Sequence, residues 1–176
     1  MYECNKLWVL FSEMLHKAAF GAGCFWGTEK FFRKQFRNSL TTIGVGYMGG
    51  ATLNPRYEVV CSGSTGHAEV VYMEFNSTDS KITYEQLVDF FYRMHDPTTK
   101  DRQGDDKGSQ YRSVIFYYDD NQLVVAKKVT QRLGGKVSGQ IVTTFEPAAK
   151  YYPAEKYHQN YLGKPGGGYC NHYLRW

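Results

Sequence analysis

Hydrophobic residues recur in two spacings along this chain, and each spacing predicts a different kind of element. Short apolar or β-branched runs, bounded by Gly, Pro and polar residues, predict strands at 17–23, 40–47, 68–75, 111–118 and 140–145. Apolar side chains that repeat every three or four positions predict helices at 25–37, 83–95 and 121–133. Thr83 is the expected N-cap of the second helix, and Pro97 follows its end.

The order of these elements predicts an α+β fold, because helices and strands do not alternate strictly and an all-parallel sheet is therefore disfavoured. We expect a mixed central sheet packed with helices, in a ferredoxin-like two-layer core, followed by a long irregular C-terminal tail. The single domain divides into a variable lead at 1–16, a core at 17–148 and the tail at 149–176. Within the tail, a short helix can form at 154–162, and the glycines at 166–168 make a flexible joint.

Composition narrows the class of protein further. A chain of 176 residues suits one domain, and 42% hydrophobic with 22% charged residues excludes wholesale disorder. The net charge of +4 comes without a block of Lys and Arg, so a nucleic-acid partner is not expected, and no apolar run is long enough to cross a membrane. The four cysteines have no C-x-x-C spacing, which disfavours a zinc or iron–sulfur site and favours a reducing compartment, the cytoplasm.

Cys24 lies in the glycine-rich junction between the first predicted strand and the first predicted helix, in the run GAGCFWG at 21–27. A phosphate-binding loop is opposed by the bulk of Phe25 and Trp26 and by the lack of an acidic residue in the next strand. As a thiol at the first helical turn, Cys24 would face free backbone N–H groups and the positive end of the helix dipole, which lower the pKa of a thiol. A small buried hydrophobe fits the spacing equally well.

Five motifs in the same order resemble those of the peptide methionine sulfoxide reductase A family, over about residues 17 to 170. They are GCFWG at 23–27, GYMGG at 46–50, NPRYEVVCSGSTGHAE at 54–69, HDPT with QGDDKGSQYRS at 95–113, and AEKYHQ with GYC in the tail. The departures are few. Met48 stands where the family has alanine, the lead is unlike the family, and the tail has one cysteine, Cys170.

The resemblance implies a thiol-dependent oxidoreductase that reduces the S epimer of methionine sulfoxide, free or in proteins, to methionine. Cys24 falls on the family's nucleophile, which becomes a sulfenic acid. Glu69 falls on the general acid, and this role requires a raised carboxyl pKa. Tyr57 and Tyr111 fall on the two hydroxyl donors to the sulfoxide oxygen.

The resemblance also implies a substrate cradle and a way to recycle the thiol. Phe25 and Trp26 would hold the methyl group of the substrate, and Asp106 falls on a carboxylate near the substrate backbone. Cys170 would attack the sulfenic acid to form a Cys24–Cys170 disulfide, which thioredoxin reduces. No cofactor and no metal are implied, and we expect a monomer.

Two other functions stay open on the residues alone. A hydrolase could pair Cys24 with His67 or His158 and act on acyl substrates without a reductant. A binding module without catalysis could use the aromatic side chains as a cage for oxidised or methylated side chains. We interpret Cys61 as a packing residue, and His158 and Gln159 as groups that anchor a loop.

Overall fold

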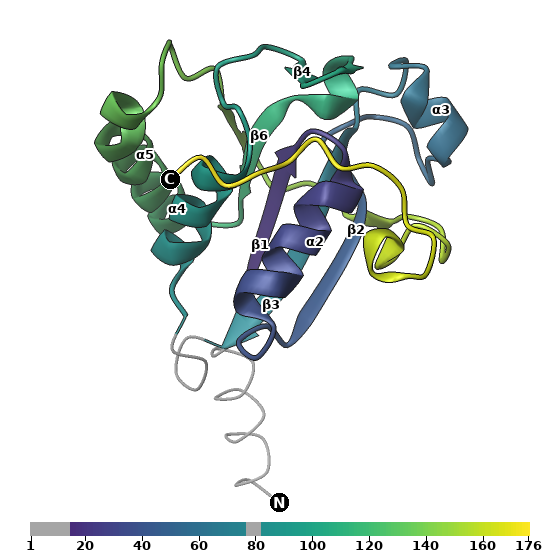
Figure 1. Cartoon of the computed structure of the whole chain (residues 1–176), viewed down its shortest axis with the longest axis horizontal. Coiled ribbons are helices and arrows are strands. Elements are labelled where there is room, and N and C mark those ends of the chain that lie inside the picture. The colour runs from purple at the N-terminus through teal and green to yellow at the C-terminus, as the bar shows by residue number, and fades with distance from the viewer. Residues whose placement is uncertain (1–14, 77–81) are drawn as a thin grey trace, which may run out of the picture.

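The computed structural model describes residues 15–76 and 82–176, which are built around a six-stranded sheet (Figure 1). The strand order is β7-β6-β1-β3-β2-β8. β6 and β7 pair in parallel, whereas β1, β2, β3 and β8 pair with antiparallel neighbours, so the predicted mixed sheet is confirmed. The strands are β1 (Leu15–Ala22), β2 (Thr42–Met48), β3 (Ala68–Asn76), β6 (Ser113–Tyr117), β7 (Thr144–Pro147) and β8 (Tyr152–Pro153), and a separate ladder joins β4 (Arg102–Gln103) to β5 (Asp106–Lys107).

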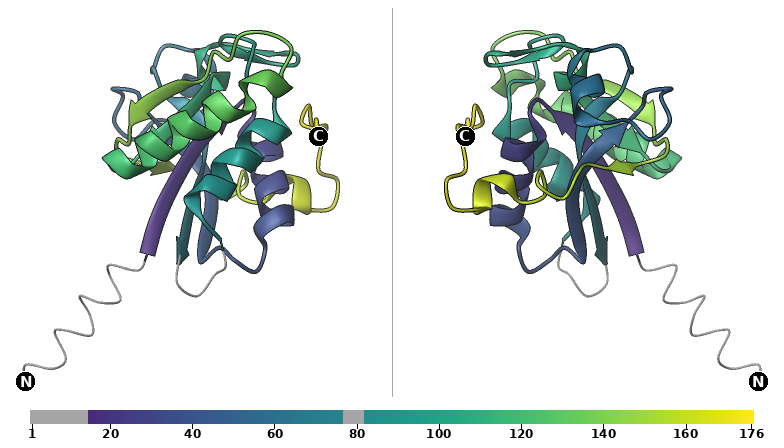
Figure 2. Two further views of the ribbon diagram at one scale, coloured as in Figure 1. Left: turned by 90° about the vertical axis from the view of Figure 1, so that its left-hand side faces the viewer. Right: turned by 90° about the vertical axis from the view of Figure 1, so that its right-hand side faces the viewer.

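Helices α2 (Phe25–Phe36), α4 (Tyr84–Met94) and α5 (Asp120–Leu133) cover one face of this sheet (Figure 2). Neighbouring residues of a strand point to opposite faces. Phe20 of β1 therefore packs under the helices, whereas Ala19 belongs to a second apolar cluster on the other face. This arrangement is the two-layer α+β core that the sequence predicts. Among the described helices, none combines the length and apolar character that crossing a membrane requires.

The N-terminus of α4 has the cap that the sequence predicts. The hydroxyl of Thr83 accepts a hydrogen bond from the backbone N–H of Gln86 at 3.2 Å, and the side-chain oxygen of Gln86 accepts one from the Thr83 N–H at 2.8 Å. A cap of this kind stabilises a helix by roughly 0.5–2 kcal/mol. Leu87 and Phe91 then face the core, so the predicted start and the predicted apolar face of this helix are both confirmed.

Some boundaries differ from the prediction because local contacts move them. Tyr57–Cys61 forms a short helix, α3, inside the predicted loop at 48–66. β6 begins only at Ser113, since the residues before it form a 3₁₀ helix, and β7 begins four residues later than predicted, at Thr144. The lead predicted at 1–16 lies outside the described residues up to position 14, and its last two residues begin β1.

The helix suggested at 154–162 is wrong, because side chains of the tail bind the core instead. The side-chain oxygen of Gln159 accepts the backbone N–H of Val45 at 2.9 Å, and its amide nitrogen donates to the Val45 carbonyl at 2.9 Å. Asn160 follows with a left-handed φ of 51°, which breaks helical geometry. Its backbone N–H donates to the buried carboxylate of Glu29 at 2.8 Å, so this part of the tail is fixed to α2. A 3₁₀ helix at Tyr161–Gly163 comes next.

The end of the tail is also fixed to the core. It runs across the N-terminal end of α2 and reaches α4, as Figure 1 shows in yellow. There the guanidinium of Arg93 donates to the backbone carbonyl of Trp176 at 2.9 and 2.7 Å. The backbone N–H of Arg175 also donates to the Arg93 carbonyl at 2.9 Å. The exposed glycines at 166–168 therefore lie between two anchored segments.

The junction of β1 and α2 lies near the middle of the sheet and places Cys24. β1 runs between β3 and β6, and its last residue, Ala22, pairs with Ser113. Gly23 then turns the chain with a φ of 89°, which residues with a side chain rarely adopt, and a Cβ there would collide with Gln103. Cys24 follows as the N-cap residue of α2.

Candidate active site

Cys24 is a half-buried thiol at the N-terminus of α2. The backbone N–H groups of Trp26 and Gly27 favour the thiolate and lower the pKa of Cys24, as the sequence predicts. Burial has the larger effect, however, and together with the nearby charge of Glu69 it raises the pKa of Cys24 well above its ordinary value. The predicted lowering of this pKa is therefore wrong, and Cys24 is a thiol at neutral pH.

Glu69 projects from the helix-covered face of β3, and its side chain is buried beside α2. Its Oε2 atom accepts the backbone N–H of Phe25 at 3.0 Å. Burial, with a contribution from the negative charge of Asp106, raises the pKa of Glu69 from 4.5 to about 8. The Glu69 carboxyl therefore holds a proton at neutral pH, which removes its repulsion of a thiolate at Cys24 and makes it a proton donor.

Two tyrosine hydroxyls lie close to these groups. Tyr57 begins α3, and Tyr111 ends the 3₁₀ helix before β6. The thiol of Cys61 lies near both hydroxyls and interacts with them electrostatically. Burial raises the pKa of both tyrosines, and the charge of Glu69 adds to the rise, so both hydroxyls remain hydrogen-bond donors. The interpretation of Cys61 as a packing residue misses this contact, and its spacing in the sequence gives no signal for it.

Aromatic rings form one wall of the site. The ring of Phe25 is buried, and its centroid lies 6.4 Å from that of Tyr57. Trp26 is half-buried, and its indole N–H donates to Nδ1 of His158 at 2.9 Å. The indole ring also stacks on Tyr161 with a centroid distance of 3.9 Å. His158 and Tyr161 thus fix the orientation of Trp26, which the interpretation of His158 as a loop anchor does not include.

Glu155 connects this wall to α3. One oxygen of its carboxylate accepts the backbone N–H of Tyr57 at 3.0 Å, and the other accepts the Tyr47 hydroxyl at 3.0 Å. The second oxygen also lies 3.9 Å from Nε2 of His158. Glu155 lies in the tail motif AEKYHQ, which was the available signal for it in the sequence.

The C-terminal tail brings Cys170 to the same end of α2. A Cβ built on Gly27 would lie 2.8 Å from the Cys170 sulfur, so the two residues are in close contact. The next residue, Asn171, donates from its amide to Oδ2 of Asp106 at 2.8 Å. Cys24, Cys61 and Cys170 are free thiols in this structure. All eight predicted site residues therefore gather around the first turn of α2.

The histidines proposed for a hydrolase make their hydrogen bonds to groups other than Cys24. The Nδ1 atom of His67 accepts the backbone N–H of Gly50 at 3.1 Å, and its Nε2 lies 2.8 Å from the Thr52 carbonyl. Nδ1 of His158 accepts the indole N–H of Trp26, and its Nε2 is buried without a hydrogen bond, 3.9 Å from the Glu155 carboxylate. Neither imidazole is hydrogen-bonded to the Cys24 thiol, which disfavours a Cys–His hydrolase. Within residues 15–76 and 82–176, no group of His, Cys, Asp or Glu is arranged to hold a metal ion.

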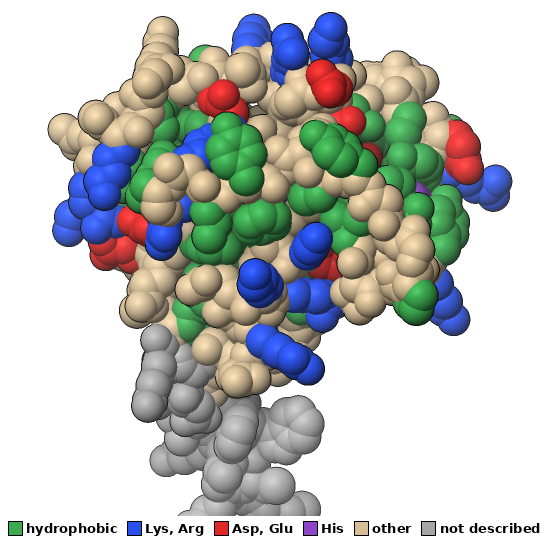
Figure 3. Space-filling model, in the orientation of Figure 1, with side chains coloured by type: hydrophobic (Ala, Val, Ile, Leu, Met, Phe, Trp, Pro, Cys, Tyr) green, Lys and Arg blue, Asp and Glu red, His purple; other side chains and the backbone are tan. Residues whose placement is uncertain are grey.

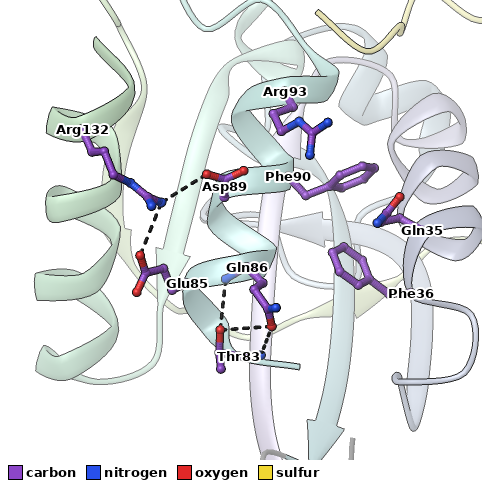
Figure 4. Close-up of a pocket in the computed structure, with 9 residues that line it drawn as sticks. All are labelled: Gln35, Phe36, Thr83, Glu85, Gln86, Asp89, Phe90, Arg93 and Arg132. Carbon is purple, nitrogen blue, oxygen red and sulfur yellow. Dashed lines mark hydrogen bonds and ion pairs between the residues drawn. The ribbon is translucent and has the colours of Figure 1, made fainter. Parts of the chain in front are cut away.

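Two surface hollows differ in their relation to these residues. One of about 420 Å³ lies between α2, α4 and α5 and contains none of the predicted site residues (Figure 4). The other, of about 400 Å³, is lined by Cys170 and His172, by the apolar side chains of Phe31, Phe90 and Leu174, and by Lys30 and Lys34. Figure 3 shows hydrophobic side chains gathered near the middle of the face that the tail crosses. The second hollow gives an outside molecule access to Cys170.

Comparison with known proteins gives a consistent result. A family model described as peptide methionine sulfoxide reductase matches residues 16–175. The peptide methionine sulfoxide reductase MsrA of Methanothermobacter thermautotrophicus is 52% identical over 150 residues, which are 84% of this chain and 86% of that protein.

Solved structures agree with the sequence comparison. The reduced form of Mxr1 from Saccharomyces cerevisiae has a TM-score of 0.87 and 39% identity, over 93% of this chain and 94% of that chain. Mxr1 in complex with Trx2 has a TM-score of 0.66 and 29% identity, over 93% of this chain and 92% of that one. The similarity therefore includes both the core and the tail.

Proposed function

The chain belongs to the peptide methionine sulfoxide reductase family, and on that premise we propose which of its residues carry the reaction. The family's enzymes use a thiol to return methionine sulfoxide to methionine. The observation that carries the assignment is the meeting of a nucleophile and an acid at one helical turn. Cys24 begins α2, and the protonated carboxyl of Glu69 bonds the N–H of the very next residue, Phe25.

In the first step, the Cys24 sulfur attacks the sulfoxide sulfur while Glu69 gives its proton to the sulfoxide oxygen. The S–O bond of the substrate breaks, the oxygen passes to Cys24 as a sulfenic acid, and methionine leaves. The carboxylate of Glu69 takes up the proton that the Cys24 thiol loses, so protons balance over the step. The hydroxyls of Tyr57 and Tyr111 donate to the oxygen as its negative charge grows.

The substrate is held at three places, which makes the site selective for one epimer. Phe25 and Trp26 contact the methyl group, and the tyrosine hydroxyls bind the oxygen. Asp106 accepts from the substrate backbone. Because the methyl group and the oxygen each have a fixed place on a chiral sulfur, only one epimer, the S epimer, presents its sulfur to Cys24.

In the second step, Cys170 attacks the sulfenic acid and forms the Cys24–Cys170 disulfide with loss of water. The contact of Cys170 with Gly27, one turn along from Cys24, supports this pairing. Thioredoxin then reduces the disulfide. Support for this partner comes from the solved complex of the relative Mxr1 with Trx2 and from the hollow that exposes Cys170. We place the enzyme in the cytoplasm as a monomer without a cofactor.

Mass spectrometry of a single turnover tests the proposal. The reduced protein receives one equivalent of methionine S-sulfoxide without any reductant, and methionine and free thiols are counted. We expect one methionine per enzyme and the loss of two thiols, mapped to Cys24 and Cys170. Cys24→Ser should form no methionine, whereas Cys61→Ser should still form methionine and lose the same two thiols. Methionine formed without thiol loss, or a disulfide through Cys61, would contradict the proposal.

A further inference from the structure

His172 is a buried tail histidine whose tautomer the structure determines. Its Nε2 atom lies 2.6 Å from the backbone carbonyl oxygen of Ala22. A carbonyl oxygen only accepts hydrogen bonds, so Nε2 carries the hydrogen. Burial lowers the pKa of His172 to about 4, so the ring is neutral at pH 7 and has only this one N–H. The Nδ1 atom is therefore a free lone pair.

That lone pair faces the sulfur of Cys170. Nδ1 lies 3.8 Å from the Cys170 Sγ atom, within hydrogen-bond distance for sulfur. The backbone carbonyl of His172 is 3.9 Å from the same sulfur, but a peptide oxygen is far less basic than an imidazole nitrogen. The imidazole is thus the group beside Cys170 that can both accept the thiol hydrogen bond and take the proton.

The positions of His172 and Cys170 against α2 depend on Gly27, because glycine has no side chain. A Cβ at that position would collide with Nδ1 of His172 and lie 2.8 Å from the Cys170 sulfur. The imidazole and the thiol therefore occupy the space against the first turn of α2 that any larger residue would fill. The same nitrogen has a second neighbour, since the hydroxyl of Thr28 lies 3.4 Å from Nε2.

We propose that His172 is the base that takes the thiol proton of Cys170 when this sulfur attacks the sulfenic acid of Cys24. The inference rests on the proposed function and adds a catalytic residue to its second step. The S–S bond forms as the S–O bond of the sulfenic acid breaks. The oxygen leaves as water with a proton from Glu69, the imidazolium of His172 returns its proton to solvent, and Glu69 is reprotonated from solvent. The Cys24 sulfur is reduced and the Cys170 sulfur is oxidised, so no outside electron carrier takes part in this step.

His172→Gln distinguishes a role of His172 as a base from a role that only anchors the tail. Glutamine can place an amide N–H near the position of Nε2, where it donates to Ala22, but it has only a methylene group in place of Nδ1. His172→Ala removes both, and the hollow next to His172 is open to free imidazole. A role limited to anchoring the tail predicts a normal second step in His172→Gln and no response of His172→Ala to imidazole.

The experiment follows one turnover of the full chain by rapid quench, with one equivalent of methionine S-sulfoxide and no reductant. We expect His172→Gln to form methionine at the normal rate, which also shows that the variant is folded, and to form the Cys24–Cys170 disulfide at least tenfold more slowly. Free imidazole should accelerate disulfide formation in His172→Ala.

Three results would contradict different parts of this account. Disulfide formation at the normal rate in His172→Gln would overturn the role of His172 and leave the proposed function intact. Failure of the unmodified enzyme to form the Cys24–Cys170 disulfide after releasing methionine would instead overturn the proposed function. Slow release of methionine itself in His172→Gln would assign His172 to the first step, and would also overturn the inference.

Discussion

The Oε2 atom of Glu69 accepts a hydrogen bond from the backbone N–H of Phe25 at 3.0 Å, one residue after Cys24. This bond joins the middle of the sheet to the first turn of α2. It also holds a buried carboxyl beside the thiol, where water cannot easily solvate a negative charge. The pH dependence of the enzyme follows from this relationship.

Sulfoxide reduction should decline as the pH rises through about 8, because the pKa of Glu69 is raised to about 8 and the reaction uses its protonated form. Glu69→Gln cannot transfer a proton and should reduce the rate by roughly 10²–10⁴ at pH 7. The measurement is the single-turnover rate of methionine formation between about pH 6 and 10. A rate that keeps rising above pH 8 in the unmodified enzyme would contradict the acid role.

The free energy of unfolding should also depend on the protonation of Glu69. Between the ordinary glutamate value of 4.5 and about 8, the folded protein keeps a proton on Glu69 that the unfolded chain has released. The free energy of unfolding therefore contains a contribution that is complete below pH 4.5 and is lost as the pH rises toward 8. Urea denaturation across this range should show a weaker decline for Glu69→Gln than for the unmodified protein. Equal slopes would mean that Glu69 has an ordinary pKa.

The two hydroxyl donors should act on the transition state more than on substrate binding. Tyr57→Phe and Tyr111→Phe keep the rings, and each should lower kcat by roughly 10–10³ with a small change in KM, because the hydroxyls meet the oxygen as its charge grows. Tyr118→Phe, which removes a hydroxyl on the other face of the sheet, is the matched control. A rise in KM at constant kcat would show that the hydroxyls only bind the substrate.

Cys170→Ser should stop turnover after one cycle. Methionine should form once per enzyme in a thioredoxin-driven assay, since the sulfenic acid on Cys24 then has no thiol partner in the tail. Cys61→Ser should continue to turn over under the same conditions. Sustained thioredoxin-dependent turnover of Cys170→Ser would mean that another thiol resolves the intermediate.

Gly27→Ala should uncouple the two steps. The new Cβ collides with His172 and pushes against Cys170, so the tail must move away while Cys24 and Glu69 keep their places. Methionine release should stay close to normal, and disulfide formation should fall by roughly tenfold or more because the two sulfurs are no longer positioned. Gly134→Ala is the control, because no heavy atom lies within 4 Å of a Cβ built there. Normal disulfide formation in Gly27→Ala would show that the observed tail position is not the reactive one.

Elements with strong local patterns were predictable from the sequence, and α4 is the clearest case. Its cap at Thr83, its apolar face and the proline after its end are all local signals, and the structure agrees with them. The segment at 154–162 shows the opposite case. Gln159 takes its partners from Val45, more than a hundred residues away, and no local pattern encodes a contact of that kind.

The sequence indicates which residues form the candidate site, but it does not indicate how deeply each residue is buried or what surrounds it. The helix-start position of Cys24 was visible in the glycine-rich junction, and the backbone N–H groups of Trp26 and Gly27 do favour its thiolate. The direction in which the pKa of Cys24 shifts was not predictable, because burial depends on the strands and the tail that surround the thiol. His172 had no signal at all, since its role depends on Ala22 and Gly27, which meet it only in the folded chain.

The glycines at 166–168 were expected to give the tail freedom, yet the chain is fastened on both sides of them. Asn160 is bound to Glu29 before the glycines, and His172 is bound to Ala22 after them. The segment that carries Cys170 is thus a short closed loop and not a free arm. Its effective concentration at Cys24 is set by the distance between these two attachments, and it should remain high at any dilution of the enzyme. Loosening either attachment would lower that local concentration and give stray thiols and oxidants more time to reach the sulfenic acid.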